Sequence, residues 1–243
     1  MALKKVTFSI EEGEFVSIVG PSGCGKSTIL NIIAGIISCS SGEIAVLGRS
    51  IHGILPEIGY LFQKDVLLPW KTVRENIALS MIFRGINKET AYKTIQGWIE
   101  KVGLKGFEDY YPVKLSGGMR RRVALAMTFV YNPQIILMDE PFSALDIQTR
   151  NMMENELLEL WAETRKTVLF VTHDIEEAIS LSDRVLVLTR NPGSIKSEYE
   201  VELGRPRNVT EVRFEKTFSE VYERIWEDLK EEVILSYEES KRK

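Results

Sequence analysis

The sequence is poor in features that mark several common classes of protein. Its 243 residues include only 2 cysteines, Cys24 and Cys39, whose spacing fits no zinc or redox motif. We therefore expect both to stay reduced, as small and partly buried residues. Long apolar runs are also lacking, because the stretch from Ile29 to Ile37 is too short to span a bilayer and is interrupted by a polar residue and a glycine. These absences argue against a disulfide scaffold and against a membrane-spanning chain.

An excess of charge of one sign is lacking too. The 31 Lys and Arg residues face 35 Asp and Glu residues, which gives a formal net charge of -4. A general nucleic-acid-binding protein usually carries a basic stripe or tail, so we expect no nucleic-acid partner. The first residues contain no apolar stretch of the secretory type. We expect a cytosolic chain whose role in membrane transport, if it has one, depends on a separate membrane partner.

What the sequence does contain is an alternation of strand and helix patterns. Helical spacing of apolar residues predicts helices over 27–37, 146–164 and 175–181. Apolar runs and period-two patterns predict strands over 6–10, 15–19, 42–47, 57–62, 135–138, 168–171 and 185–188. The alternation indicates a mainly parallel sheet with right-handed crossovers, together with an N-terminal antiparallel β portion.

Two segments depart from this alternation. Residues 72–131 contain helical patterns over 73–83 and 89–102 without a strand signal, which predicts a helical subdomain inserted into the α/β core. The core then comprises 1–71 and 132–208. Residues 209–243 form one long charged helical pattern with an apolar seam, which we interpret as a cap on the core rather than a coiled-coil partner site.

A phosphate-binding motif follows the strand predicted at 15–19. Residues 20–28 match G-x-x-x-x-G-K-[ST], with a strand before them and a helix after them. Glycines let the backbone wrap closely around phosphate oxygens, and the helix N-terminus faces the anion. Lys26 supplies a charge for the β- and γ-phosphates, and Ser27 supplies a hydroxyl for Mg²⁺. The residues predicted to bind nucleotide here are Gly20, Pro21, Ser22, Gly23, Cys24, Gly25, Lys26, Ser27 and Thr28.

Two adjacent carboxylates end a later apolar strand. Asp139 and Glu140 follow the four apolar residues 135–138, at the carboxyl end of a strand, where open α/β sheets place ligands. We expect Asp139 to hold Mg²⁺, and Glu140 to orient or deprotonate the attacking water. These motifs predict an α/β fold with a P-loop NTPase core that binds ATP and Mg²⁺.

A third motif narrows the family. The segment from Leu115 to Arg120 reads L-S-G-G-M-R and resembles the signature motif of ABC ATPases. Ser116, Gly117 and Gly118 would open a helix and offer a hydroxyl and free N–H groups to a second anion. The resemblance implies that this signature meets a phosphate loop only across a head-to-tail dimer. Each ATP would then be held by the phosphate loop of one copy and the signature of the other.

Three further residues match elements of the same family. Gln63 resembles the Q-loop glutamine, which the resemblance implies senses Mg²⁺ and water. Asp146 ends a segment that resembles the D-loop, which crosses the dimer interface, and His173 resembles the switch histidine that contacts the γ-phosphate. The implied catalytic residues are Glu140, His173 and Gln63, and the implied metal-binding residues are Ser27, Gln63 and Asp139.

The resemblance runs from about residue 2 to about residue 207 and favours the nitrate/sulfonate/taurine/bicarbonate importer group. This narrowing depends on Leu67–Trp70, Met119, Leu160–His173 and Asn191–Ile195. It implies an ATP-hydrolysing subunit that powers import of a small solute of this kind or of a vitamin precursor. The implied partners are a second copy of the chain, integral membrane permease subunits and, indirectly, a solute-binding protein, at the cytoplasmic face of the cell membrane. An ABC exporter ATPase and a non-transport ABC ATPase are the alternatives.

Three features depart from the ABC ATPase pattern or allow more than one interpretation. The aromatic residue that stacks on adenine in this family would precede Ala2, so we expect the stack to be lost or to lie upstream of Met1. The basic run at 120–122 is interpreted as a solvated helix face, because the positive end of a helix dipole disfavours cations. Leu67–Trp70 fits equally the core of the helical insertion and an apolar surface for the membrane subunit.

Overall fold

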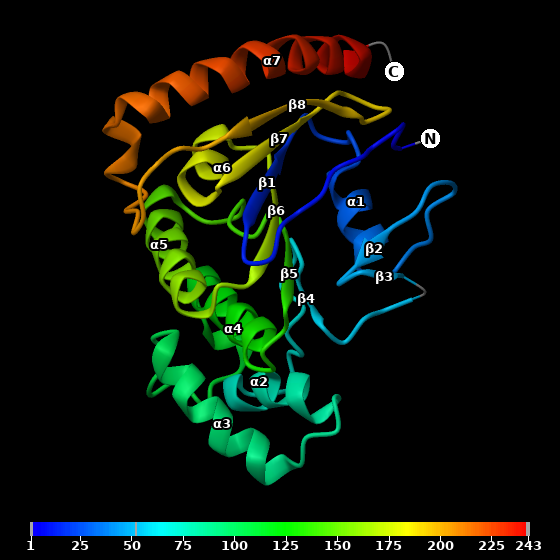
Figure 1. Cartoon of the computed structure of the whole chain (residues 1–243). Coiled ribbons are helices and arrows are strands. Elements are labelled where there is room, and N and C mark those ends of the chain that lie inside the picture. The colour runs from blue at the N-terminus through cyan, green and yellow to red at the C-terminus, as the bar shows by residue number, and fades with distance from the viewer. Residues whose placement is uncertain (1, 52, 242–243) are drawn as a thin grey trace.

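A six-stranded sheet forms the centre of the computed structural model, which describes residues 2–51 and 53–241, with side chains described up to residue 235. The strands lie in the order β4-β5-β6-β1-β7-β8 (Figure 1). Five of them run parallel, and β8 is antiparallel to β7. Their bounds in chain order are β1 (Phe15–Val19), β4 (Ile58–Leu61), β5 (Ile135–Asp139), β6 (Thr167–Thr172), β7 (Arg184–Leu188) and β8 (Ile195–Glu200).

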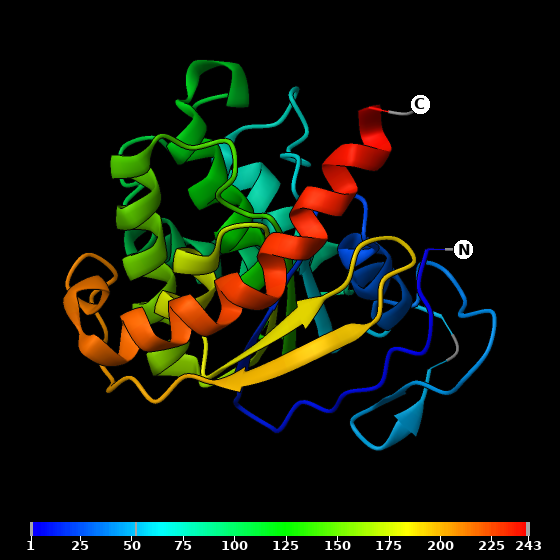
Figure 2. The same ribbon diagram turned by 90° about the horizontal axis from the view of Figure 1, so that it is seen from above.

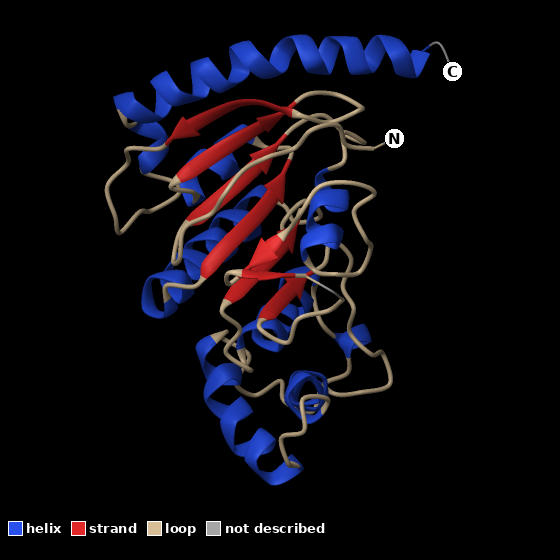
Figure 3. Cartoon of the chain, turned by 45° about the vertical axis from the view of Figure 1, so that its right-hand side comes forward, coloured by secondary structure: helices blue, strands red, loops and turns tan. Residues whose placement is uncertain are grey.

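Helices cover both faces of this sheet (Figure 3). On β1, Val16 and Ile18 share an apolar cluster with α1, whereas Phe15 shares another with α4 and α5. Alternate residues of a strand face opposite sides, so β1, which is buried along its whole length, joins both layers. The helices are α1 (Lys26–Ile33), α2 (Val73–Ile82), α3 (Lys88–Lys101), η1 (Pro112–Lys114), α4 (Gly117–Phe129), α5 (Ile147–Thr164), α6 (Ile175–Leu181), η2 (Val212–Phe214) and α7 (Lys216–Lys241).

The helices α2, α3 and α4 build an apolar cluster of their own beside the sheet. A capping box begins α2: the Thr72 hydroxyl accepts the N–H of Glu75, and the Glu75 carboxylate accepts the N–H of Thr72. Buried Asn76 holds the preceding loop, because its Oδ1 accepts the N–H of Leu68 at 2.8 Å. These local bonds start α2 at Val73, as the sequence predicts.

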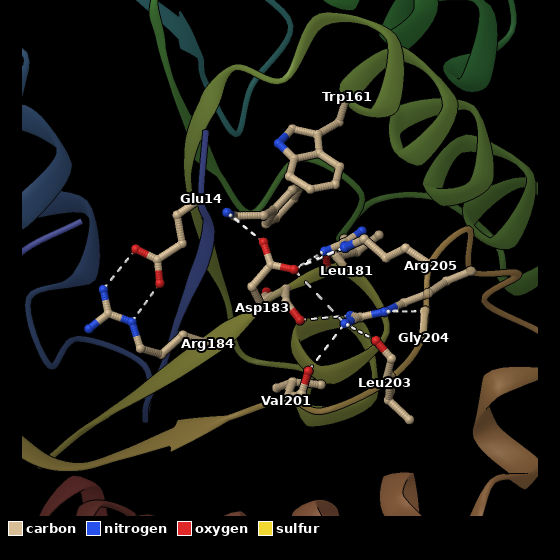
Figure 4. Close-up of polar contacts among 12 residues, drawn as sticks. Glu14, Trp161, Leu181, Asp183, Arg184, Val201, Leu203, Gly204 and Arg205 are labelled. Carbon is tan, nitrogen blue, oxygen red and sulfur yellow. Dashed lines mark hydrogen bonds and ion pairs between the residues drawn. The ribbon is translucent and has the colours of Figure 1, made fainter. Parts of the chain in front are cut away.

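The segment that connects β8 to α7 is anchored by charged side chains (Figure 4). Asp183 accepts hydrogen bonds from the N–H of Phe15 at 3.0 Å and from Nη2 of Arg205 at 2.7 Å. The Arg205 guanidinium also lies over the Trp161 ring, 4.1 Å from its centroid. Arg207 is buried and donates to the backbone carbonyls of Ser182 and Leu203, and burial lowers its pKa to about 10. These bonds set the path of the chain into α7, which crosses above the β7 and β8 strands (Figure 2).

Most predicted elements are present, but two predicted strands are wrong or shortened. Residues 6–10 form no strand; Val6, Phe8 and Ile10 pack against the α1 layer without a neighbouring strand to complete a hydrogen-bond ladder within the described part of the chain. The strand predicted over 42–47 shrinks to β2 (Ala45–Val46), which pairs antiparallel with β3 (Arg49–Ser50). This small sheet is the N-terminal antiparallel β portion of the fold.

The sequence pattern also does not predict β8, and it places the start of the last helix too early. The six residues of β8 include three charged ones, and the strand is mostly half-buried, so no apolar signal marks it. The last helix begins at Lys216, after η2, so Phe214, which the predicted range 209–243 includes, lies outside it and is 90% exposed. The seam itself is confirmed by buried Phe218 and Ile225. Residues 1, 52, 242 and 243 of the predicted ranges lie outside the described residues.

The apolar segment after Gln63 is partly buried and partly exposed. Leu67 packs against the apolar clusters on both sides of it, whereas the Trp70 side chain is 69% exposed. None of the helices that the structure describes is both long enough and apolar enough to cross a lipid bilayer.

Candidate functional site

The phosphate-loop residues and the predicted catalytic and metal-binding residues gather at one edge of the sheet. The neighbouring parallel strands β4, β5, β6 and β1 lead at their carboxyl ends into Gln63, Asp139, His173 and the loop that starts at Gly20. The strand register keeps these ends level with one another. This edge is where open parallel sheets bind ligands, so residues that lie far apart in sequence meet in one site.

The loop between β1 and α1 has the backbone geometry of a phosphate site. Gly23 and Gly25 have φ angles of 77° and 106°, in the region that favours glycine. No side chain in the described part of the structure caps α1, so its first backbone N–H groups are left for an anion. The Lys26 side chain is only 5% exposed, and its Nζ donates to the carbonyl oxygens of Gly20 at 2.8 Å and Pro21 at 3.2 Å. The loop therefore offers N–H donors and one buried cation to phosphate oxygens.

Oxygen ligands for a cation lie beside this loop. Ser27 Oγ donates to Asp139 Oδ1 at 2.9 Å. Burial raises the pKa of the Asp139 carboxyl, which the hydrogen bond from Ser27 opposes. A cation next to this buried carboxylate would favour its ionised form. Mg²⁺ typically takes one or two carboxylates together with phosphate oxygens and water, so a carboxylate and a hydroxyl at the phosphate loop fit the predicted ion.

Glu140 lies at the centre of the predicted catalytic residues. Its φ of 40° turns the chain sharply after β5. One carboxylate oxygen, Oε2, lies 3.0 Å from Nδ1 of His173 and 3.2 Å from Nε2 of Gln63, and the other, Oε1, lies 3.8 Å from Nζ of Lys26. The hydrogen bond with His173 lowers the pKa of Glu140 and raises the pKa of the imidazole. Glu140 is therefore a carboxylate at neutral pH, as a base or water-orienting group requires.

A second candidate anion site lies at two neighbouring helix starts. Ser116 caps α4 by accepting an N–H of its first turn at 3.2 Å, and Asp146 caps α5 in the same way at 3.0 Å. The two starts are in close contact, because a Cβ built on Gly118 would lie 2.8 Å from Cγ2 of Thr149. Ser116, Gly117 and Asp146 are exposed. Within the described residues, no hydrogen bond or ion pair joins these helix starts to the phosphate loop.

The interpretation of the basic run on α4 as a solvated face is wrong for Arg121, whereas the Arg120 side chain is partly exposed. The Arg121 side chain is 3% exposed, and its Nη1 donates to the carbonyl oxygen of Phe62 at 2.8 Å. Asp65 pairs with Arg120 at 3.2 Å and lies 3.7 Å from Arg121. Burial lowers the pKa of Arg121 to about 10. Arg120 and Arg121 therefore tie α4 to the segment around Gln63, a contact that no local pattern could reveal.

One pair of buried carboxyls is not predicted by the sequence pattern. Glu154 on α5 is fully buried, and Glu177 on α6 is 4% exposed. Burial raises the pKa of Glu154 to about 7 and that of Glu177 to about 8. The charged groups around them are Asp174, Arg150 and Arg213, and Nη2 of Arg213 lies 3.9 Å from Oε2 of Glu154. The pair joins the helix that follows Asp146 to the helix that follows His173.

We expect Glu154→Gln to change how stability depends on pH. Because the pKa values in the folded state are raised, the two carboxyls contribute stability that is present below about pH 4.5 and is lost as the pH rises to about 7 to 8. Glutamine cannot ionise, so the variant should have a free energy of unfolding about 1–3 kcal/mol above wild type near pH 8.5. Near pH 5 this advantage should vanish. Chemical denaturation at the two pH values measures the difference.

The matched control for this experiment is Glu159→Gln, which removes an exposed carboxylate from the same helix. Its free energy of unfolding should stay within about 0.5 kcal/mol of wild type at both pH values. The explanation fails if Glu154→Gln is no more stable than wild type near pH 8.5, or if the control gives the same gain.

Known proteins resemble this chain over most of its length. The family model described as "ABC transporter" matches residues 3–143. An uncharacterized ABC transporter ATP-binding protein of Methanocaldococcus jannaschii is 46% identical over 97% of this chain and 86% of its own length. The aliphatic sulfonates import ATP-binding protein SsuB of Bacillus thuringiensis is 42% identical over 90% of this chain and 86% of its own length. The taurine import ATP-binding protein TauB of Roseobacter denitrificans is 40% identical over 98% and 91%, respectively.

A solved structure shares the fold. It is the dimeric structure of an ATP-binding cassette in a post-hydrolysis state, bound to ADP and Pi. It is 36% identical to this chain, covers 84% of it and 92% of its own chain, and has a TM-score of 0.73. The α/β fold with a P-loop NTPase core, predicted from the sequence, is thereby confirmed.

Proposed function

Because this chain belongs to the ABC transporter family, we propose that it is the ATP-hydrolysing subunit of an importer for a small solute of the sulfonate or taurine type. The names of two relatives that match nearly the whole chain support this solute class. The observation that carries the proposal is the position of the Glu140 carboxylate. It lies within 4 Å of the phosphate-loop Lys26 and forms hydrogen bonds with Gln63 and His173.

Each group at this site has a task in the proposed hydrolysis. The backbone N–H groups of residues 20–28 and the Lys26 ammonium bind the phosphates of ATP. Ser27, Asp139 and Gln63 would hold Mg²⁺, which supplies positive charge to the phosphate oxygens when bound. The Glu140 carboxylate orients or deprotonates the attacking water, and the His173 imidazole donates a hydrogen bond towards the γ-phosphate.

The proposed active form is a head-to-tail dimer. The exposed start of α4 at Ser116 and Gly117 offers N–H groups to an anion, yet it is not joined to the phosphate loop of its own chain in the described structure. A second copy would supply the phosphate loop that this start needs, with Asp146 at the interface. The dimeric state of the structural relative supports this arrangement. ATP would favour the closed dimer and ADP the open one.

We also propose that the helical subdomain, residues 72–131, lies between two parts of the ATP-binding core, 1–71 and 132–208, and faces the membrane partner. Exposed apolar side chains near Gln63, notably those of Phe62 and Trp70, support a docking surface for integral membrane permease subunits there. The chain would then work at the cytoplasmic face of the cell membrane, with a solute-binding protein as an indirect partner.

The experiment that tests the proposal has two stages. The purified chain should release inorganic phosphate from ATP in the presence of Mg²⁺, with a loss of activity in EDTA. The chain should then drive uptake of radiolabelled taurine when it is reconstituted with permease and solute-binding subunits. A folded chain that releases no phosphate from ATP rejects the ATPase, whereas active hydrolysis without uptake of taurine or an alkanesulfonate rejects the solute class.

A further inference from the structure

The turn between β7 and β8 lies directly against the phosphate loop. A Cβ built on Gly193 would lie 2.1 Å from the carbonyl oxygen of Cys24, so a larger residue could not keep this contact. Nδ2 of Asn191 donates to the carbonyl oxygen of Gly23 at 3.4 Å. Two carbonyl groups of the phosphate loop therefore face the turn. The proposed function assigns no role to the Asn191–Ile195 segment. The contact with the phosphate loop is a structural role that this segment has.

The N-terminal segment contacts both this turn and the phosphate loop. The N–H of Lys4 donates to the carbonyl oxygen of Gly193 at 2.8 Å, and the N–H of Gly193 donates to that of Ala2 at 2.9 Å. Leu3 lies against the loop itself, because a Cβ built on Gly25 would lie 2.6 Å from its Cδ2. The turn and the N-terminal segment thus bond to each other and pack together against the phosphate loop.

The last helix holds this turn from the other side. Glu232 of α7 accepts the N–H of Arg190 at 2.9 Å through Oε2 and a hydrogen bond from Nζ of Lys196 at 3.2 Å through Oε1. The Glu232 side chain is only 13% exposed. Nζ of Lys196 also donates to the carbonyl oxygen of Asp228, one turn earlier on α7, at 2.7 Å. Figure 2 shows α7 running above the β7 and β8 strands, so one carboxylate joins the helix to both ends of the turn.

We propose that Glu232 is a positioning residue for nucleotide binding, which holds the β7–β8 turn against the phosphate loop and so lets α7 contribute to the affinity for ATP. The inference rests on the proposed function, because it concerns the same nucleotide site. A loop that binds phosphate through backbone N–H groups loses affinity when it becomes more mobile, since ordering it then costs free energy on binding. Bound ATP and the transition state use the same loop, so KM should rise while kcat is nearly unchanged.

Four variants test this proposal. Glu232→Ala should raise KM for ATP and the Kd for a fluorescent ADP analogue about 3- to 10-fold, with kcat within about twofold of wild type. Glu232→Gln, which keeps an acceptor for the N–H of Arg190, should give a smaller rise. Gly193→Ala, which acts on the contact directly, should raise both constants at least about tenfold. Glu227→Gln removes an exposed carboxylate from the same helix and should leave both constants unchanged.

A second control separates the contact with the phosphate loop from a general effect of alanine. Gly204→Ala adds a methyl group where no described atom beyond its two chain neighbours lies within 4 Å, and it should leave nucleotide affinity unchanged. An unchanged Kd in Glu232→Ala would overturn the positioning role, whatever Gly193→Ala does, as would a fall in kcat without a rise in KM. A wild-type chain that binds no nucleotide would instead reject the proposed function, so the two failures are distinguishable.

Discussion

Replacing Glu140 by glutamine is expected to lower the rate of ATP hydrolysis by about 10²- to 10³-fold while ATP binding is retained. Glutamine keeps the shape of the side chain and can still bond to Gln63 and His173, but it cannot accept a proton from water. The phosphate loop and Lys26 are unaltered, so ATP should accumulate unhydrolysed. Since ATP favours the closed dimer, size-exclusion chromatography with ATP should show a species of twice the monomer mass.

Two comparisons make this result specific to Glu140. Glu163→Gln removes an exposed carboxylate and should hydrolyse ATP like wild type. ADP in place of ATP should not produce the dimer of the Glu140→Gln variant, because the γ-phosphate is what the opposing signature would bind. Retained wild-type turnover in Glu140→Gln would reject Glu140 as the catalytic carboxylate.

Mixing two inactive variants is expected to restore hydrolysis, because each nucleotide site would be shared between two copies. Lys26→Ala removes the cation of the phosphate loop, and Gly117→Asp places a carboxylate where the signature would meet phosphate. Each variant alone should lose more than about 100-fold in kcat/KM. A mixed dimer contains one copy of each variant. One of its two sites then combines the altered phosphate loop with the altered signature, and the other site combines the intact phosphate loop with the intact signature. An equal mixture should therefore recover about one quarter of the wild-type rate.

The structure indicates that the change in the signature leaves the fold intact. A Cβ built on Gly117 would lie 3.8 Å from Cδ2 of Leu145 and 3.9 Å from Nη2 of Arg120, which are ordinary contacts. A carboxylate near a helix N-terminus also stabilises the helix. Gly117→Ala is the neutral control and should lose much less activity than Gly117→Asp. A mixture that stays as inactive as its components, or a Gly117→Asp chain that is active alone, would contradict the shared site.

Residues close together in sequence were predictable because their chemistry is local. The glycines and Lys26 of the phosphate loop, and the strand that ends at Asp139, depend on spacing and on the elements next to them. The resemblance to ABC ATPases added Gln63 and His173, and the structure brings both into contact with Glu140. The roles of these residues, and the division into core and helical subdomain, stay predictions.

Residues whose environment depends on distant partners were not predictable. Arg121 looks like a surface residue in its own helix, yet Asp65 and the Phe62 carbonyl make its burial possible. Strand β8 has no apolar signal of its own and forms because β7 offers it a hydrogen-bonding edge.

The amino-acid sequence alone determined the phosphate loop, the two carboxylates and the alternation of strands and helices, since each follows from spacing along one stretch of chain. Only the tertiary structure decided which charged groups are buried together, such as Glu154 with Glu177, and that the turn at Gly193 touches the loop at Cys24. The physical reason is that burial and close approach depend on which segments pack together, and packing is a property of the whole chain.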